Sequence, residues 1–360
     1  MRLTTLFRWL ACALPVGLAA QSVHLVGPGG FATIQAAVDA AAPDDIVHVQ
    51  AGTYFSFTVT KSLRIRALGP VTLGTSILQP GHVVVQAPAG ATVDLVGFDM
   101  MSLTVTSGRA TLDTCTVRNG TTVQHASLHL QSCVLSGGTR ALLATQADVT
   151  AVQSSFVGPS TGFSVAGPLI DLDGSRFHAS SCHTASTFVF QSVLLCVRAT
   201  NGARAWFADG SIGFTPAGHC PLQVSADSQV RIDRTIYSAA PGCPQPIAGP
   251  LLGVQRSSPL LLGQTFQTTF RGEPNTFVVL YASPFLGTVD FGPLLEQPSW
   301  LDDQHSFVVT VLLTDAAGEA PVSFPVPSGP GIADLTLWLK GLSGFALPLQ
   351  VSPPVGGVAR

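Results

Sequence analysis

The sequence predicts an all-β protein in which a repeat solenoid is followed by a small antiparallel β-sandwich. A short motif recurs about every twenty residues between positions 93 and 235: an apolar residue, an Asp or Gln, and a small residue two positions later. With 36 Gly, 26 Pro and 46% hydrophobic residues, the composition is typical of a β-rich chain with many turns. Beyond residue 250 the repeat stops, and short apolar segments alternate with turn signals. A period near twenty predicts stacked coils, one per repeat.

The first twenty residues have the pattern of a secretory signal peptide. Arg2 and Arg8 precede an apolar run over residues 9–20, which is broken by Pro15 and ends in small residues. This run is too short to span a bilayer as a helix, and later apolar runs are interrupted by Gly, Pro or polar residues. We therefore expect residues 1–20 to be removed and the mature chain to be exported, with no membrane span.

One amphipathic helix is expected at the start of the mature chain. Apolar residues recur at helical spacing over residues 31–41, residues 43–45 end the pattern, and residues 46–49 begin a strand. A helix in this position would cover the first coil, whose strand edges and apolar end would otherwise be open.

The same segment resembles a known family. Its pattern is similar to the N-terminal cap and first strand of right-handed parallel β-helix proteins of the pectin-lyase-like superfamily, and it comprises Gly29, Phe31, Ile34, Val38, Ile46, Val49, Gly52 and Tyr54. The family usually has Gly after the Pro, where this chain has Asp44. The resemblance implies a right-handed parallel β-helix over residues 21–245 and carbohydrate as the ligand class. Polysaccharide-active members of the family place carboxylates on the outer face of the β-helix.

Within each coil, burial must change phase once. Leu112, Cys115 and Val117 cannot all face inward on one continuous strand, so we expect a bend at Asp113 and Thr114. Stacking then predicts a row along one edge of the solenoid, formed by Asp94, Asp113, Gln131, Gln153, Asp173, Gln191 and Asp233. One interpretation is a ladder of mutually satisfied polar groups. The other is a track for glycan hydroxyls, or a Ca²⁺ site that relieves repulsion between Asp94 and Asp113.

The C-terminal part reads as a sandwich domain. A Pro-rich linker is expected at residues 246–260 and the domain at residues 261–360. Six apolar segments predict its strands: 266–270, 277–281, 307–313, 322–326, 335–339 and 345–351.

Asp171 and Asp173 are the candidate catalytic pair. They flank the inward Leu172 and should point outward together, about 6 to 7 Å apart, near the separation expected for inverting hydrolysis. His129 and Gln153 are expected close by on neighbouring coils, and Arg176 follows after the bend. A simpler explanation is that Asp173 belongs to the row at the bend. The spaced signatures of polygalacturonases, pectin esterases and pectate lyases have no residue-by-residue match in this chain.

Other side chains suggest binding sites. Trp206 and Arg231 are expected at equivalent outward positions of successive coils, where they could stack a sugar ring or pack under a loop. His125 and His129 are expected on one side of a strand, and His178, Cys182 and His183 in one loop. Neither group has the paired spacing of a structural zinc site, so solvent-exposed histidines are expected and no metal is assigned.

Six cysteines remain after the signal peptide. An even number in an exported protein favours disulfides, although six cysteines allow 15 pairings. Neighbour pairing predicts Cys182 with Cys196 and Cys220 with Cys243. Cys115 and Cys133 occupy the same place in adjacent coils, where either a bridge or two reduced thiols would fit.

Composition also limits the function. Charged residues make up 10% of the chain and the net charge is −3, so the basic stripe of a nucleic-acid-binding protein is missing. The expectation is a secreted or cell-surface protein with a binding or structural role towards carbohydrate. The alternatives are a polysaccharide lyase or glycoside hydrolase acting on the outer face, and a passive spacer with an anchoring or assembly domain.

Overall fold

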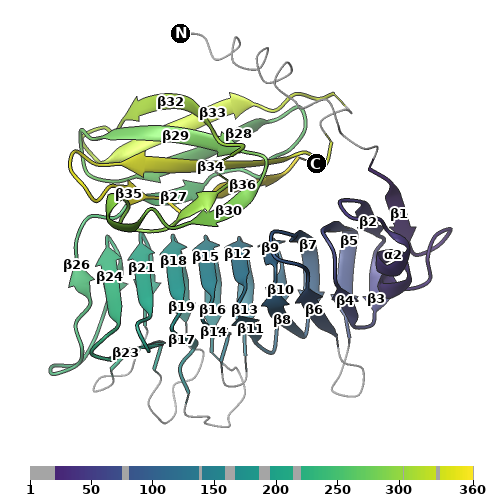
Figure 1. Ribbon diagram of the computed structural model, residues 1–360, viewed down its shortest axis with the longest axis horizontal. Coiled ribbons are helices and arrows are strands. Elements are labelled where there is room, and N and C mark those ends of the chain that lie inside the picture. The colour runs from purple at the N-terminus through teal and green to yellow at the C-terminus, as the bar shows by residue number, and fades with distance from the viewer. Residues whose placement is uncertain are drawn as a thin grey trace. The chain divides into compact units, whose positions relative to one another are not determined.

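The computed structural model describes residues 21–74, 81–137, 140–158, 167–185, 195–213, 220–302, 304–329 and 333–359. The chain from Val23 onward divides into two compact units, Val23–Leu251 and Leu252–Arg360. The first unit is a parallel β-helix and the second an antiparallel β-sandwich (Figure 1), which confirms the predicted fold class. The expected signal peptide lies outside the described residues. Within the described ranges, no helix is long and apolar enough to cross a membrane.

Each coil of the β-helix passes through three runs of strands. The first run contains β1 (Val23–Val26), β2 (Ile46–Val49), β5 (Leu63–Leu73), β7 (Thr92–Met100), β9 (Arg109–Asp113), β12 (Ser127–Gln131), β15 (Asp148–Val152), β18 (Arg176–Ser180), β21 (Arg204–Ala208), β24 (Gln229–Asp233) and β26 (Ile247–Ala248). The second contains the later halves of β5 and β7 with β3 (Gly52–Tyr54), β10 (Thr116–Val117), β13 (Val134–Ser136), β16 (Ser155–Val157), β19 (His183–Ala185), β22 (Ser211–Ile212) and β25 (Ile236–Tyr237). The third contains β4 (Phe57–Val59), β6 (His82–Gln86), β8 (Ser102–Ser107), β11 (Thr121–Gln124), β14 (Leu142–Thr145), β17 (Ile170–Asp173), β20 (Val197–Thr200) and β23 (Leu222–Val224). Every pairing in these runs is parallel, and the third run forms a sheet of its own.

Inward side chains of the three runs stack in columns and form the core of the β-helix. On β12 and β15, for example, Leu128 pairs with Val149 and Leu130 with Ala151, and all four are fully buried. Phe177 lies between Phe156 and Phe207, with ring centroids 5.8 and 5.3 Å away. Stacking therefore removes apolar surface that a single coil could not bury alone.

The first and second runs are separated by the bend that the sequence predicts. One residue per coil has a left-handed backbone there, namely Gly97, Thr114, Ser132, Gln153, Ser181, Asp209 and Arg234, with φ between 45° and 78°. Left-handed backbone is unfavourable for residues other than Gly, so the surrounding hydrogen bonds must hold it in place.

The residue after the left-handed one provides such bonds. This inward column contains Cys115, Cys133, Ser154, Cys182 and Thr235. The Cys133 thiol lies 3.4 Å from Leu112 O and 3.3 Å from Gln131 O, and Ser154 Oγ donates to Val152 O at 3.1 Å. Ser154 Oγ also accepts from Cys133 N at 3.2 Å. Small polar side chains therefore add hydrogen bonds to amides and carbonyls at the bend, where Gln131 O and Val152 O also accept from Thr114 N and Ser132 N.

The predicted row of Asp and Gln is wrong as a single row. Asp113, Gln131 and Asp233 do lie in one column, together with Val96, Val152 and Ala208. Gln153 instead occupies the left-handed position, Asp94 pairs with Thr111 two residues earlier, and Asp173 lies on the third run. Gln191 falls outside the described residues. The coils differ in length. Aligning the Asp/Gln motif of successive coils at a fixed spacing therefore shifts some members by one or two residues, and it places Asp173 at the wrong bend.

Asp94 and Asp113, between which the sequence predicts repulsion, are not paired with each other, since Asp94 pairs with Thr111 and Asp113 with Val96. Asp94 lies 3.9 Å from Arg64 Nε, and burial raises its pKa while Arg64 and Arg109 lower it.

Helix α2 (Ile34–Ala40) packs beside β1, β2 and β4 and covers the first coil, within the predicted range 31–41. Thr33 caps it by accepting a hydrogen bond from Ala36 N at 3.1 Å. Asp44, at the position where the cap pattern that this segment resembles has Gly, has a φ of 69° and is therefore left-handed. Strand β1, which the sequence pattern did not predict, pairs in parallel with β2.

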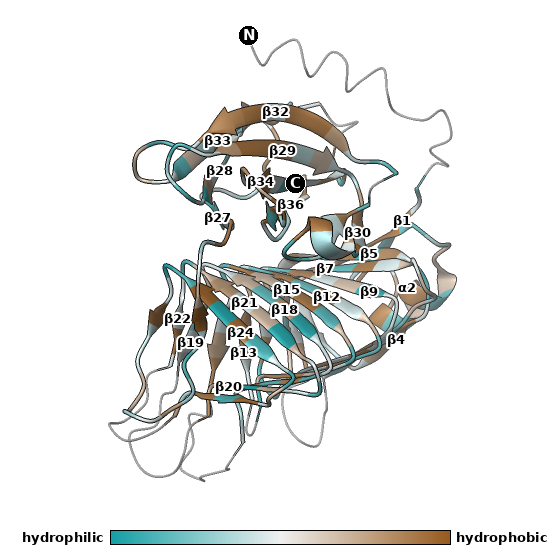
Figure 2. Ribbon diagram, turned by 60° about the vertical axis from the view of Figure 1, so that its left-hand side comes forward, coloured by the Kyte–Doolittle hydropathy of each residue, from teal (hydrophilic) through white to brown (hydrophobic). Residues whose placement is uncertain are grey.

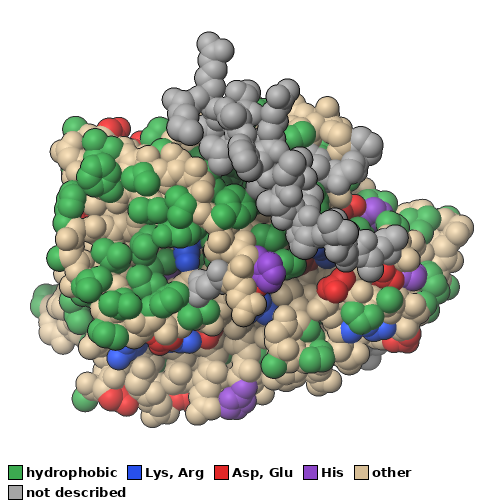
Figure 3. Space-filling view, turned by 45° about the horizontal axis from the view of Figure 1, so that its top comes forward, with side chains coloured by type: hydrophobic (Ala, Val, Ile, Leu, Met, Phe, Trp, Pro, Cys, Tyr) green, Lys and Arg blue, Asp and Glu red, His purple; other side chains and the backbone are tan. Residues whose placement is uncertain are grey.

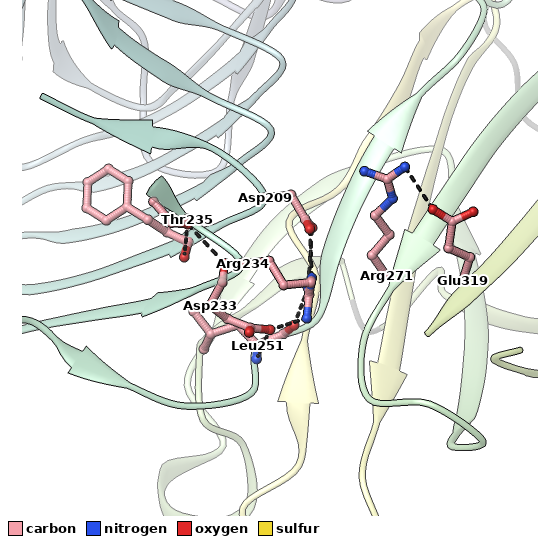
Figure 4. A network of polar contacts seen from close by, with 8 residues as sticks. Asp209, Asp233, Arg234, Thr235, Leu251, Arg271 and Glu319 are labelled. Carbon is pink, nitrogen blue, oxygen red and sulfur yellow. Dashed lines mark hydrogen bonds and ion pairs between the residues drawn. The ribbon is translucent and has the colours of Figure 1, made fainter. Parts of the chain in front are cut away.

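The last coils are held by an ion network and a disulfide. Arg234 donates to Asp209 Oδ1 at 2.7 Å and to Leu251 O at 2.9 Å, and it also binds Asp233 (Figure 4).

Cys220 and Cys243 form the predicted disulfide. Cys182 and Cys196 are free and buried, so their predicted bridge is wrong; Cys182 belongs to the inward column at the bend. Of the two alternatives for Cys115 and Cys133, a disulfide bridge or two reduced thiols, the structure has the reduced thiols.

The sandwich consists of two main sheets and a hairpin. One sheet is formed by β27 (Gly253–Arg256), β28 (Thr265–Arg271) and β33 (Glu319–Pro325). The other has the order β32 (Phe307–Leu313), β29 (Phe277–Ser283), β34 (Thr336–Ser343) and β35 (Gln350–Val351), with β36 (Val355–Val358) also paired to β34. The hairpin comprises β30 (Leu286–Val289) and β31 (Ser299–Leu301), joined through the 3-10 turn η1 (Gly292–Leu294). Five of the six predicted segments are strands; 345–351 contains only the two-residue β35.

Candidate functional site

The third run presents a polar outer face. Its inward residues Val123, Ala144, Leu172 and Ala199 are fully buried, so alternation turns their neighbours outward. One outward column contains Thr104, Thr122, Leu143, Asp171, Arg198 and Gln223, and the other contains Gln124, Thr145, Asp173 and Thr200. We call these ten residues the third-run face. Apart from Asp171, each is at least partly exposed.

Two arginines hold Asp171 at the centre of this face. Arg198 donates from Nε to Asp171 Oδ1 at 2.7 Å and from Nη2 to Oδ2 at 2.5 Å, and Arg140 Nε lies 3.2 Å from the same Oδ2. The Asp171 side chain is 3% exposed, whereas those of Arg140 and Arg198 are 38% and 34% exposed. The hydrogen bond that Arg198 donates to Asp171 raises the pKa of Arg198. Asp171 therefore orients two arginine side chains that remain partly exposed.

Asp173 has a different environment two residues along the strand. It accepts a hydrogen bond from Asn201 Nδ2, and Asn201 has a left-handed backbone with a φ of 57° at the bend after β20. Asp173 is partly exposed. Both carboxylates point outward from β17 as the sequence predicts, but each is already paired with a residue of the next coil.

The expected neighbours of this pair lie elsewhere. His129 lies on β12 of the first run, where Nδ1 is 2.7 Å from Thr150 Oγ1, and Gln153 lies at the bend after β15. Arg176, on β18, donates to both oxygens of Asp148 at 2.5 and 2.9 Å. The expectation that His129 and Gln153 adjoin Asp171 and Asp173 is wrong, because the two pairs belong to different sheets of the coil.

Trp206 and Arg231 pair on adjacent strands, as the sequence predicts. However, Trp206 is only 4% exposed and packs with Ala208 and Leu251. Its ring also lies 6.3 Å from that of His178. Trp206 is therefore a packing residue and presents no free face to a sugar.

The histidines do not gather into a metal site. His125 lies at the bend before β12, with a φ of 50°, and is exposed, while His129 is 1% exposed on β12. His178 on β18 is 1% exposed, and burial lowers its pKa to about 3. His183 is exposed on β19, with Cys182 inward at the intervening bend. Solvent exposure is thus correct for His125 and His183 and wrong for His129 and His178. The described ranges hold no group of three potential metal ligands.

Arg140, Arg198 and Asn201 are site residues that the sequence pattern did not predict. Alternation within the third run could have predicted Arg198, because Arg198 occupies the position that Asp171 has one coil earlier. Loops of unequal length separate the second and third runs, so the sequence spacing does not show that the two positions correspond.

No protein-family model and no curated protein matches this chain. Among solved structures, the chain is similar to one described as the crystal structure of alginate lyase from Paenibacillus sp. str. FPU-7. The sequence identity is 15% and the TM-score 0.40, with 60% of this chain and 95% of that chain covered.

Proposed function

We propose that this protein is an exported, non-catalytic carbohydrate-binding protein that holds an extended polysaccharide along the third-run face. The observation that carries the proposal is the pair of partly exposed guanidinium groups, Arg140 and Arg198, held in place by the buried Asp171. This arrangement is preorganised, because the carboxylate restricts the two arginines before any ligand arrives.

The rest of the face has the chemistry of a sugar-binding surface. Hydroxyl and amide side chains of Thr104, Thr122, Gln124 and Thr145 repeat from coil to coil, at the roughly 4.8 Å spacing of paired strands. A polymer lying along the stack would meet donors and acceptors at regular intervals. Export is part of the proposal and is supported by the signal-peptide pattern and the Cys220–Cys243 disulfide.

Binding accounts for the geometry better than turnover does. A general base or nucleophile must reach a reacting atom, whereas both oxygens of Asp171 already accept hydrogen bonds and its side chain is 3% exposed. The pectin-lyase-like superfamily remains part of the proposal, supported by the cap residues and the parallel coils.

The test is a panel of neutral and acidic polysaccharides, on which both retention and turnover are measured. We expect the wild type to be retained by at least one polymer without releasing reducing ends or unsaturated uronates. Arg198→Gln should weaken binding about tenfold or more, because hydrogen bonds to a charged group contribute roughly 1.5 to 3 kcal/mol.

The matched control is Arg204→Gln, which removes an exposed arginine on β21, outside the third-run face. It should leave retention unchanged. Turnover that disappears in a folded Asp171→Asn variant would establish a lyase or hydrolase instead. If the folded wild type is not retained by any polymer of the panel, the result would contradict carbohydrate binding and favour the passive spacer.

A further inference from the structure

The third-run face is a strip whose charges lie towards one end. Its residues come from six parallel strands, from β8 to β23, and five steps of about 4.8 Å give a length of roughly 24 Å. The charged residues of the face lie on β17 and β20. The residues that the face takes from β8, β11 and β14 are uncharged, namely Thr104, Thr122, Gln124, Leu143 and Thr145. A polymer along the strip would therefore meet a neutral stretch and an ionic one.

The ionic stretch has the charge to take one anionic group. Arg140, Arg198 and Asp171 form one cluster, in which Asp171 Oδ2 lies 3.2 Å from Arg140 Nε and both Asp171 oxygens accept from Arg198. Two positive charges and one negative charge sum to +1, so a single carboxylate would neutralise the cluster. Arg198 gives two of its five N–H donors to Asp171 and is 34% exposed, which leaves three donors that Asp171 does not use.

A second anionic group nearby would be unfavourable. Asp173 points outward from β17 and is partly exposed, so its carboxylate repels an anion that lies beyond the cluster. On the neutral side, Leu143 pairs with Asp171 and offers an anion no side-chain hydrogen bond. With Asp173 included, the face and Arg140 carry two positive and two negative charges, and the whole chain carries −3. A polyanion therefore gains no long-range attraction to this protein.

We propose that the third-run face selects a mainly neutral polysaccharide with isolated carboxylate groups, rather than a polymer that is charged at every sugar. One carboxylate binds Arg140 and Arg198, and the neutral sugars extend over β14, β11 and β8, where hydroxyl and amide side chains face them. The inference rests on the proposed carbohydrate binding at this face and adds which class of polymer is bound.

Strand β32 of the sandwich has the opposite chemistry. Six of its seven residues are Phe, Val or Leu, and it contains no charge. Val308, Val311 and Leu313 are 52%, 55% and 56% exposed. Figure 2 shows β32 as hydrophobic, and Figure 3 shows apolar side chains gathered over the sandwich. Sugar hydroxyls against these side chains would lose hydrogen bonds to water without replacement, so we expect the polymer on the β-helix.

Binding to polymers of graded charge tests the selection. The probes are a neutral hydroxyethyl cellulose and two carboxymethyl celluloses, one with a carboxylate on every sugar and one with a carboxylate once in several sugars. The same series is made on xylan and on dextran. We expect the wild type to bind the sparsely charged polymer of at least one series about tenfold more tightly than its neutral counterpart, and more tightly than the densely charged one.

Arg198→Gln tests the seat of the carboxylate. It should lower the affinity for the sparsely charged polymer to that for the neutral one, because the cluster loses its net positive charge. Thermal unfolding shows whether the variant is folded. If it is not, Arg140→Gln takes its place, since the side chain of Arg140 is 38% exposed and tolerates replacement more readily.

Asp173→Asn tests the rejection of dense charge. It should raise the affinity for the densely charged polymer about threefold, because a like charge is removed while an oxygen that can accept from Asn201 is kept. Asp39→Asn is the matched control, since it removes an exposed carboxylate from α2 and changes the net charge equally. It should leave that affinity unchanged.

Four results would overturn the selection while leaving carbohydrate binding intact. They are equal binding of neutral and sparsely charged polymers, tightest binding of the densely charged polymer, an Asp173→Asn variant that behaves like Asp39→Asn, and retention by other polysaccharides of the panel but by none of these series. A folded protein that no polysaccharide retains would contradict the proposed function as well.

Discussion

The β-helix and the sandwich differ in whether their strand edges are covered. In the β-helix each strand stacks on the preceding coil, α2 covers the first coil, and a disulfide and the Arg234 network hold the last. The sandwich leaves β32 apolar and open at one edge. The difference shows that the two units expose different kinds of surface: a polar outer face in the β-helix, and an apolar edge in the sandwich.

Particular ion pairs in the two units differ in burial. In the β-helix, the side chain of Asp209 is 6% exposed beside Arg234, and that of Asp171 is 3% exposed beside Arg198. In the sandwich, the side chains of the Arg271–Glu319 pair are 35% and 41% exposed. We therefore expect breaking these pairs of the β-helix to cost more than breaking Arg271–Glu319.

The largest expected effect compares the two cores. Phe177→Ala in the β-helix and Phe270→Ala in the sandwich each remove a fully buried ring and should lower the free energy of unfolding by about 3 to 5 kcal/mol. Hydrogen exchange should locate the damage. Phe177→Ala should speed exchange in β15, β18 and β21, and Phe270→Ala in β28, β33 and β27. Equal acceleration in both units by either variant would contradict separate cores.

The second effect compares the two ion networks in Figure 4. Arg234→Met leaves the buried carboxylate of Asp209 without its cation and should cost about 3 kcal/mol in denaturant unfolding. Arg271→Met removes an exposed pair and should cost less than about 1 kcal/mol. Equal costs would remove the distinction between the units.

The third effect is a pH dependence specific to the β-helix. His178 has a pKa of about 3 when folded and about 6.5 when unfolded, so the unfolded chain binds more protons between these values. The stability from neutral His178 is present above pH 6.5 and is lost as the pH falls towards 3. The loss between pH 7 and pH 5 should be about 2 kcal/mol.

Chemical denaturation at several pH values measures this loss. His178→Leu should flatten the profile over that window. His183→Gln, which replaces an exposed histidine on the next strand, should keep the wild-type slope. An unchanged slope in His178→Leu would show that another group titrates.

The smallest effect tests the column at the bend. Ser154→Ala removes the side-chain partner of Cys133 N and one of two hydrogen bonds to Val152 O, which still accepts from Ser132 N, and should cost about 1 kcal/mol. Ser154→Cys should recover most of this stability, because Cys115, Cys133 and Cys182 occupy the same column. Thermal unfolding of the three proteins is sufficient, and a Cys variant no better than Ala would argue against side-chain bonding at this position.

Much of the fold could be predicted because each coil repeats the same pattern of buried and exposed residues. The period near twenty, the bend after Leu112 and the helix at 31–41 all follow from residue spacing. The sandwich strands were predictable from apolar segments between turns, since antiparallel neighbours are close in sequence.

The site was less predictable. Asp171 and Asp173 were found because alternation about Leu172 is local. Their partners Arg198 and Asn201 lie 27 and 28 residues away, in the next coil, and neighbouring coils differ in length. His129 pairs with Thr150 on the first run, whereas Asp171 lies on the third run. The sequence pattern did not show which run each residue belongs to, so it placed His129 next to Asp171.

The sequence by itself determined the coil, its bend and its apolar core, because these depend on the spacing of residues within about twenty positions. Only the tertiary structure decided which charges meet, which cysteines are bridged and which strand stays open. Those properties depend on the register between coils and on the order of strands in a sheet, and loops of unequal length shift both without changing the local pattern.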